Sequence, residues 1–95
     1  MYEDILREMR NLVRRNQIII PYHAIDEASD DGSEKHDIEQ IIYTGFIRIR
    51  QIDRETKERK YVIRGETTDG RLAEVVAKII KIGTRKVVII TTYEV

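Results

Sequence analysis

The sequence predicts an α+β domain in which N-terminal helices pack on a four-stranded antiparallel β-meander. The half of the chain from residue 46 to residue 95 is rich in β-branched residues and alternates between apolar and polar side chains, as half-buried strands do. Within it, Asp69 and Gly70 form an Asp-Gly pair, which is a strong hairpin signal. Apolar residues recur every three or four positions between Tyr2 and Arg15, which is typical of an amphipathic helix. The length favours a single domain over residues 1–95.

The N-terminal helix is expected over residues 1–15, and its last turn is strongly basic. The cations there are Arg10, Arg14 and Arg15. They either complement the negative end of the helix dipole or contact a partner or a nucleic acid. Residues 18–20 are all isoleucine, which indicates a short edge strand or an extended connector.

Two acidic helices are expected between residues 21 and 45. Pro21 suits the first turn of the earlier one, because proline lacks the N–H that a helix start leaves unused. Gly32 is a typical left-handed stop for that helix. The later helix begins at Ser33 or Glu34 and ends at Gly45.

Four strands are expected to form the sheet. In the first, alternation places Ile47 and Ile49 on one face and Arg48 and Arg50 on the other. The second covers residues 60–64, and the third, residues 72–82, has one face of small apolar side chains that leaves room for a helix. The fourth, residues 86–93, is apolar on both faces at its start, as expected of a central strand or of one that meets a partner.

Charge is balanced overall but unevenly distributed along the chain. Residues 21–45 hold seven acidic residues and a single lysine, whereas bases predominate from residue 46 onwards. One interpretation is internal complementarity, with acidic helices beside a basic sheet. The other is that the open face of the sheet carries a positive stripe for a polyanion. The leading bases of this half of the chain are Arg48, Arg50, Arg54, Lys57, Arg59, Lys60 and Arg64.

Several function classes lack support in the sequence. There is no cysteine, which removes disulfides and thiolate catalysis and fits a reducing cytoplasm. No apolar run is long enough for a membrane span, so we expect a soluble cytoplasmic protein with no membrane partner. The spacing of His23 with Asp26 or Glu27, and with His36, is of a kind that arises by chance, so we expect neither a metal site nor a cofactor.

Short motifs in a fixed order give the chain a resemblance to a known family. They are Tyr22-His23-Ala24 at a helix start, Asp37-Ile38 opening the next helix, Asp69-Gly70-Arg71 in a hairpin, and Ile90-Thr91-Thr92-Tyr93 in the last strand. Together they resemble a bacterial and archaeal family of domains of unknown function. That family is similar in fold to the RelE and BrnT group of small toxins, which are ribonucleases paired with antitoxins.

The resemblance implies a metal-independent endoribonuclease, if the chain is an enzyme. RNA cleavage of that kind needs a base, an acid and cations for the phosphate. His23 would be base or acid, Arg64 with Arg48 would hold the phosphate, and Tyr93 or Tyr61 would stack or donate a proton. Arg71 matches the family's hairpin arginine and joins Arg48, Arg50 and Lys60 as a candidate for nucleic-acid binding. Each of these residues also has a structural alternative as a helix cap, a solvated side chain or a backbone contact.

Three hypotheses follow for function. The first is a toxin-like ribonuclease or RNA-binding protein with an antitoxin-like partner. The second is a non-catalytic protein-interaction module, such as a homodimer, suggested by the apolar second face of the last two strands. The third is a small-ligand domain with a pocket between helices and sheet.

Overall fold

The computed structural model covers residues 1–95 and contains three helices and five strands. In chain order these are α1 (Glu3–Arg14), β1 (Ile18–Ile19), α2 (Tyr22–Asp30), α3 (Lys35–Thr44), β2 (Phe46–Ile52), β3 (Arg59–Glu66), β4 (Leu72–Ile82) and β5 (Thr84–Glu94). The α+β class is therefore confirmed. The sheet has one strand more than the expected four-stranded meander, because Ile18 and Ile19 form an edge strand, one of the two alternatives expected for residues 18–20, and pair in parallel with Val87 and Val88 of β5.

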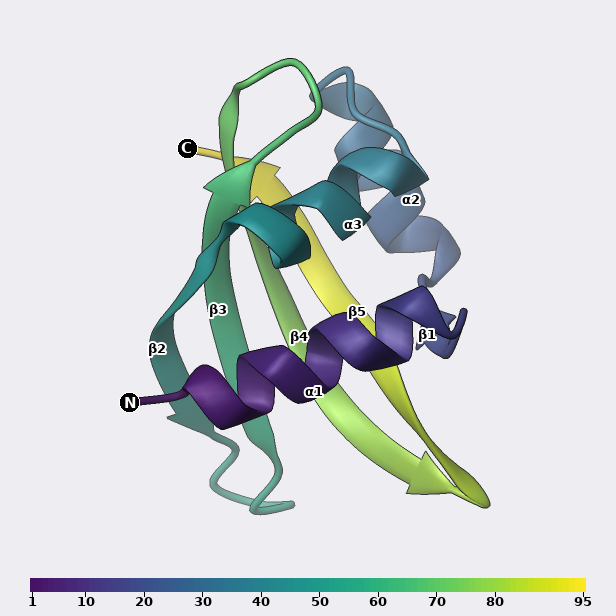
Figure 1. Cartoon of the computed structure of the whole chain (residues 1–95), viewed down its shortest axis with the longest axis vertical. Coiled ribbons are helices and arrows are strands. Elements are labelled where there is room, and N and C mark those ends of the chain that lie inside the picture. The colour runs from purple at the N-terminus through teal and green to yellow at the C-terminus, as the bar shows by residue number, and fades with distance from the viewer.

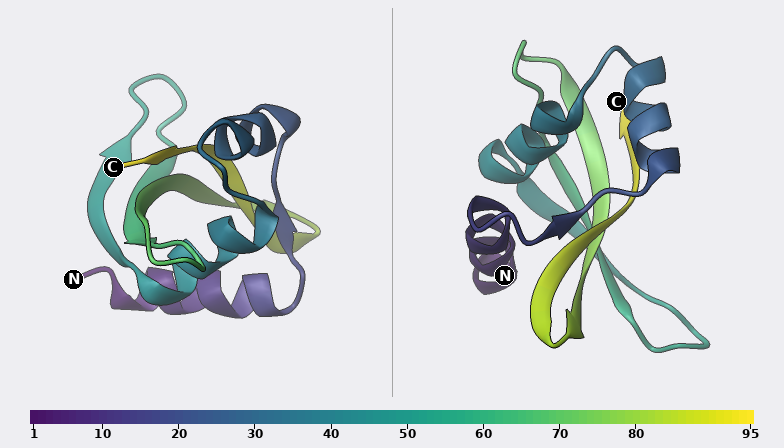
Figure 2. Two further views of the ribbon diagram at one scale, coloured as in Figure 1. Left: turned by 90° about the horizontal axis from the view of Figure 1, so that it is seen from above. Right: turned by 90° about the vertical axis from the view of Figure 1, so that its right-hand side faces the viewer.

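The sheet has the strand order β1-β5-β4-β3-β2, in which β2 to β5 form the expected antiparallel meander. Helices α1 and α3 cover one face of this twisted sheet, and α2 lies beside the C-terminal half of β5 (Figures 1 and 2). We call the opposite face, which no helix covers, the open face. No helix in the structure has both the length and the apolar character needed to cross a bilayer.

The core lies between the helices and the covered face of the sheet. Met9 of α1, Ile38 and Ile42 of α3, and Ile63 and Val75 of the sheet are among its fully buried members. The small side chains predicted for one face of β4 do face the helices, where they leave room for α3.

Two glycines allow α3 to approach the sheet closely. A Cβ atom on Gly65 would lie 2.4 Å from the carbonyl oxygen of Ile41, and one on Gly45 would lie 2.3 Å from the carbonyl oxygen of Arg64. The end of α3 is also held by Arg10 of α1, whose Nε and Nη2 each donate a 2.9 Å hydrogen bond, to the carbonyl oxygens of Ile42 and Gly45. Arg10 therefore satisfies the exposed C-terminal carbonyls of a neighbouring helix rather than those of its own.

A β-bulge in β2 makes one sequence prediction wrong. Ile47 pairs with Ile63, but the register shifts at Arg48, so that Ile49 pairs with Val62 and Arg50 pairs with Tyr61. Because an extra residue exchanges the two faces of the strand beyond it, Ile49 lies on the open face and Arg50 lies on the helix side. There the Arg50 guanidinium sits 5.7 Å from the ring centre of Tyr2.

Candidate functional site

A cluster of polar side chains lies at one point of the open face. The register places Arg64 of β3 and Tyr93 of β5 directly beside Glu74 of β4, so the three form a row across neighbouring strands. Arg48 reaches the same carboxylate from the bulge in β2. We call Arg48, Arg64, Glu74 and Tyr93 the arginine–tyrosine cluster.

Glu74 is the centre of the cluster and accepts all of its internal hydrogen bonds. Arg48 donates to it through Nε (2.6 Å) and Nη2 (3.1 Å). Arg64 donates to Glu74 through Nε (2.9 Å). The hydroxyl of Tyr93 also donates to Glu74, at 2.8 Å. The side chain of Glu74 is only 3% exposed, so the two guanidinium groups provide the counter-charge that a buried carboxylate requires.

These contacts set the protonation states of the cluster near neutral pH. Hydrogen bonds from Arg48 lower the pKa of Glu74 to about 2, and bonds from Tyr93 and Arg64 add to the effect against the opposing influence of burial. The hydrogen bond to Glu74, together with burial, raises the pKa of Tyr93. Glu74 is therefore ionised, with both carboxylate oxygens accepting hydrogen bonds, while Tyr93 keeps its proton.

The cluster presents donors to solvent on its outer side. The side chains of Arg48 and Arg64 are 37% and 35% exposed, and Tyr93 is 41% exposed. Nη1 of Arg48 and both terminal nitrogens of Arg64 donate to no protein atom. Two guanidinium groups against one carboxylate leave the cluster with one net positive charge, which suits an anionic oxygen such as that of a phosphate.

His23 lies away from this cluster, on α2. Its Nε2 is 2.6 Å from the carbonyl oxygen of Ile90 in β5, to which a protonated Nε2 donates. One and two turns further along α2, Glu27 accepts from the hydroxyl of Thr91 and the N–H of Thr92, and Asp31 accepts from the N–H of Glu94. Side chains spaced four residues apart on α2 thus bond backbone groups of β5 beyond the point where β1 ends.

The structure separates the other residues predicted to bind nucleic acid. Lys60 shares the open face with Arg48 and lies 3.8 Å from the carboxylate of Asp53. Arg50 is on the helix side, as described above. Arg71 joins the loop between α2 and α3 to the sheet, because it donates to the carbonyl oxygens of Asp31 and Gly32. The expected single stripe on the open face is therefore reduced to Arg48, Lys60 and Arg64.

Comparison with known proteins places the chain in a sequence family. A family described as a domain of unknown function, DUF4258, matches residues 20–94. The chain belongs to this family. The match begins after α1 and β1 and includes every residue of the arginine–tyrosine cluster. No curated protein and no solved structure matches the chain.

The prediction of a domain-of-unknown-function family is therefore confirmed for this DUF4258 domain. The similarity to RelE and BrnT toxins is not part of what the match establishes, and it stays a prediction.

A second buried carboxylate in the DUF4258 domain has a structural role. Asp37, at the start of α3, accepts from the N–H of Glu34 and from both the N–H and the hydroxyl of Thr68, at 2.9, 2.9 and 2.6 Å. Burial alone would raise the pKa of Asp37, but the hydrogen bonds from Thr68 and Glu34 lower it to about 2. Asp37 thus completes a capping box and ties α3 to the turn between β3 and β4.

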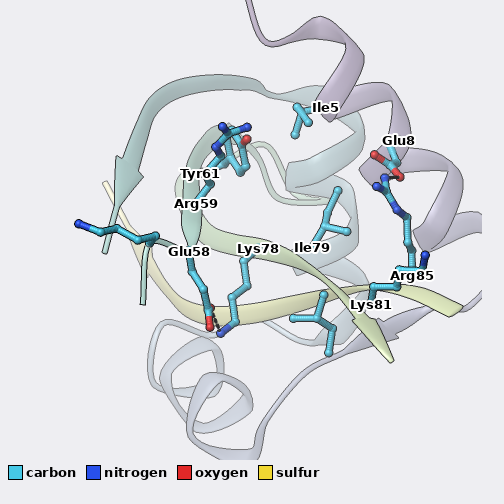
Figure 3. A pocket seen from close by; sticks show the side chains of 11 residues that line it. Ile5, Glu8, Glu58, Arg59, Tyr61, Lys78, Ile79, Lys81 and Arg85 are labelled. Atoms are coloured by element: carbon cyan, nitrogen blue, oxygen red, sulfur yellow. Dashed lines mark hydrogen bonds and ion pairs between the residues drawn. The ribbon is translucent and has the colours of Figure 1, made fainter. Parts of the chain in front are cut away.

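A separate hollow lies elsewhere on the structure. It has a volume of about 640 Å³ and lies between α1 and the ends of β3, β4 and β5 (Figure 3). Two of its bases are paired, because Lys78 pairs with Glu58 at 2.5 Å and Arg85 pairs with Glu8, while Lys57, Arg59 and Lys81 make no ion pair. Of the residues predicted from the sequence for catalysis it contains Tyr61 alone, and no group of three or more histidine, cysteine and acidic side chains in the chain is arranged to hold a metal ion.

Sequence reasoning found three members of the cluster but missed Glu74. The signal was present, because Glu74 is an acidic residue inside a strand whose neighbours are Ala73, Val75 and Val76. A charged residue in such a run is a candidate for a buried, paired group. Its partners, however, come from strands ten or more residues away in the chain, so the pairing was visible only in the fold.

Proposed function

We propose that this DUF4258 domain binds RNA through the open face, with Arg48, Arg64 and Tyr93 contacting one phosphodiester and its neighbouring base. The observation that carries the proposal is the pair of partly exposed guanidinium groups held by one buried carboxylate, each with terminal N–H groups that make no hydrogen bond within the chain. Guanidinium groups held in this way lose little conformational freedom on binding, which favours phosphate recognition.

Tyr93 extends the same proposal from phosphate to single-stranded RNA. Its ring is partly exposed and its hydroxyl is anchored to Glu74, so the ring has a fixed position on the surface. An aromatic ring beside a phosphate contact supports base stacking, which is the usual means of holding unpaired RNA. Lys60 lies on the same face and adds a second cation for the neighbouring phosphate.

A toxin-like ribonuclease is the sharper form of this proposal. The cluster offers cations for the phosphate, and the Tyr93 hydroxyl would donate a proton to RNA only after leaving its hydrogen bond to Glu74. Glu74 is too acidic and too fully hydrogen-bonded to act as the base. His23 is the base predicted from the sequence, and because it lies on α2 away from the cluster, it would act only on RNA that reaches from the cluster to α2. Its Nε2 is engaged with Ile90, while Nδ1 makes no hydrogen bond within the chain. Cleavage would then yield a 2′,3′-cyclic phosphate without a metal ion.

The test compares RNA binding by the wild type and by the Arg64→Ala variant as salt is raised. A single lost phosphate contact reduces the slope of log affinity against log salt by about 0.7 for single-stranded RNA. Arg59→Ala is the matched control, because Arg59 is an exposed arginine of the same strand that makes no ion pair and whose strand position is on the helix side. Equal slopes for Arg64→Ala and the wild type would contradict the proposal.

Cleavage is tested separately by inducing the protein in a bacterial host and following growth and the integrity of total RNA. Growth arrest with RNA loss, relieved by both His23→Ala and Arg64→Ala, is the expected result for a ribonuclease. RNA binding in vitro with normal growth and intact RNA would leave the binding proposal in place and remove the catalytic one.

A protein-interaction module is the second candidate function. It is favoured by the apolar side chains that remain exposed on the sheet, chiefly Phe46 (57%), Leu72 (50%) and Ile82 (73%). Single exposed apolar residues are ordinary on protein surfaces, but those of β2 lie along an unpaired strand edge.

A further inference from the structure

One edge of the sheet is covered by other segments of the chain and the other edge is not. At one edge, β5 is covered by β1 and by the side chains of α2, which bond its remaining backbone groups. At the other edge, β2 pairs only with β3, and its outer side meets no strand (Figures 1 and 2). Every residue of β2 except Ile47 is exposed.

Strand β2 has only part of the protection that an exposed edge normally has. Such edges are usually short, bulged or covered by another segment, or they contain proline or charged side chains, because unpaired backbone groups recruit further strands. Residues Phe46–Ile52 form a seven-residue strand without proline or lysine. The bulge at Arg48 interrupts its start, but Ile49 to Ile52 pair regularly with β3 and present an even edge.

The side chains along this edge define the chemistry of a suitable partner. Arg48 and Arg50 are the charged residues of β2, and the strand contains no acid. Arg50 makes no ion pair and lies against the ring of Tyr2. Beside the start of β2 is a groove of about 280 Å³ whose lining includes Met1, Tyr2 and Phe46, and it suits an apolar side chain.

We propose that the outer edge of β2 binds an extended segment of a partner protein as a sixth strand, with acidic residues alternating with apolar ones. Backbone hydrogen bonds to β2 would provide the affinity, and carboxylates on the helix side of the added strand, beside the unpaired Arg50, would provide the preference, with the apolar residues on the open face beside Ile49. The basis of this proposal is the bare edge and its charge, and it does not depend on RNA binding.

A second copy of the chain is a poorer occupant of the same edge. Pairing β2 with β2 would bring four arginines and no acid into the two strands, so the Arg50 of each copy, which makes no ion pair in its own chain, would find no counter-charge there. An acidic strand supplies a carboxylate for Arg50 and a second copy supplies none.

The experiment uses the full chain and three synthetic peptides of about nine residues, the length of an ordinary strand. The first alternates glutamate and valine, the second has lysine in place of glutamate, and the third is the acidic peptide with every second amide N-methylated along one edge. Binding is measured by fluorescence anisotropy, and its place is found from backbone amide NMR shifts. Sedimentation without peptide gives the oligomeric state.

The acidic peptide is expected to bind, with its amide shifts concentrated in residues 46–52. Affinity should fall about tenfold or more for the lysine peptide and for the N-methylated peptide, since each lacks one of the two interactions. Arg50→Glu should weaken binding of the acidic peptide, whereas Arg15→Glu, the same charge change on the far end of α1, should not.

Three results would overturn the proposal. One is an absence of binding by the acidic peptide. Another is equal binding of the N-methylated peptide, because charge alone would then account for the affinity. The last is a dimer in sedimentation with β2 amides already protected from exchange, which would assign the edge to a second copy.

Discussion

The substitution Glu74→Gln tests whether a single buried carboxylate organises the open face. Glutamine has nearly the shape of a protonated glutamic acid, so the variant removes the charge without leaving a cavity. The amide would keep one acceptor oxygen but would place an NH₂ group against the guanidinium donors of Arg48 and Arg64. The loss of stability therefore reports the interaction of the charge with its partners.

The magnitude follows from the pKa of Glu74 in the folded chain. It is lowered from 4.5 to about 2, which corresponds to roughly 3 kcal/mol of stabilisation at neutral pH. Because the folded pKa is the lower one, this stabilisation is fully present above pH 4.5 and is lost as the pH falls towards about 2. Glu74→Gln should therefore cost roughly 3 kcal/mol at pH 7 and progressively less below pH 4.5.

Urea unfolding of the wild type and the variant between pH 7 and pH 3 measures this difference directly. Glu66→Gln is the matched control, because Glu66 is an exposed glutamate on β3 whose side chain makes no hydrogen bond. At pH 7 the melting temperature of Glu74→Gln should also fall by about 10 °C or more. A loss below about 0.5 kcal/mol at pH 7, or a difference that stays constant with pH, would refute the reasoning.

Three further predictions concern the helices. Asp37→Asn should lower the free energy of unfolding by roughly 2 kcal/mol at pH 7 and by less below pH 3.8, because the pKa of Asp37 in the folded chain is lowered to about 2. Asp30→Asn, at an exposed site, is the control in the same urea titration. Glu27→Ala should speed hydrogen exchange at the N–H of Thr92, as seen by NMR, and unchanged exchange would show that α2 does not protect β5. Gly65→Ala should destabilise the fold by about 3 kcal/mol or more, because its Cβ would collide with the end of α3, and near-wild-type thermal unfolding would contradict that packing.

Local patterns in the sequence were enough to predict most of the secondary structure. The expected stops at Gly32 and Gly45 agree with the ends of α2 and α3, and Gly32 has the predicted positive φ of 75°. The strand expected over residues 72–82 agrees with the bounds of β4. These features depend on residues that are close together in the sequence, so local sequence patterns are enough to predict them.

Local patterns failed where one residue altered the register. The alternation of residues in β2 does not indicate the bulge at Arg48. The bulge nevertheless places Arg50 on the helix side and lets Arg48 hydrogen-bond to Glu74. The sequence could likewise suggest Arg64 and Tyr93 as site residues, but not that Glu74 would join them.

The sequence by itself determined the helices, the antiparallel meander and the residue types available for an anion site. Only the tertiary structure decided which of them meet, because the cluster is assembled from three strand pairings between residues far apart in the chain. It also decided that β5 is protected by α2 while β2 remains bare. Strand order and edge protection arise from long-range packing, which no local periodicity records.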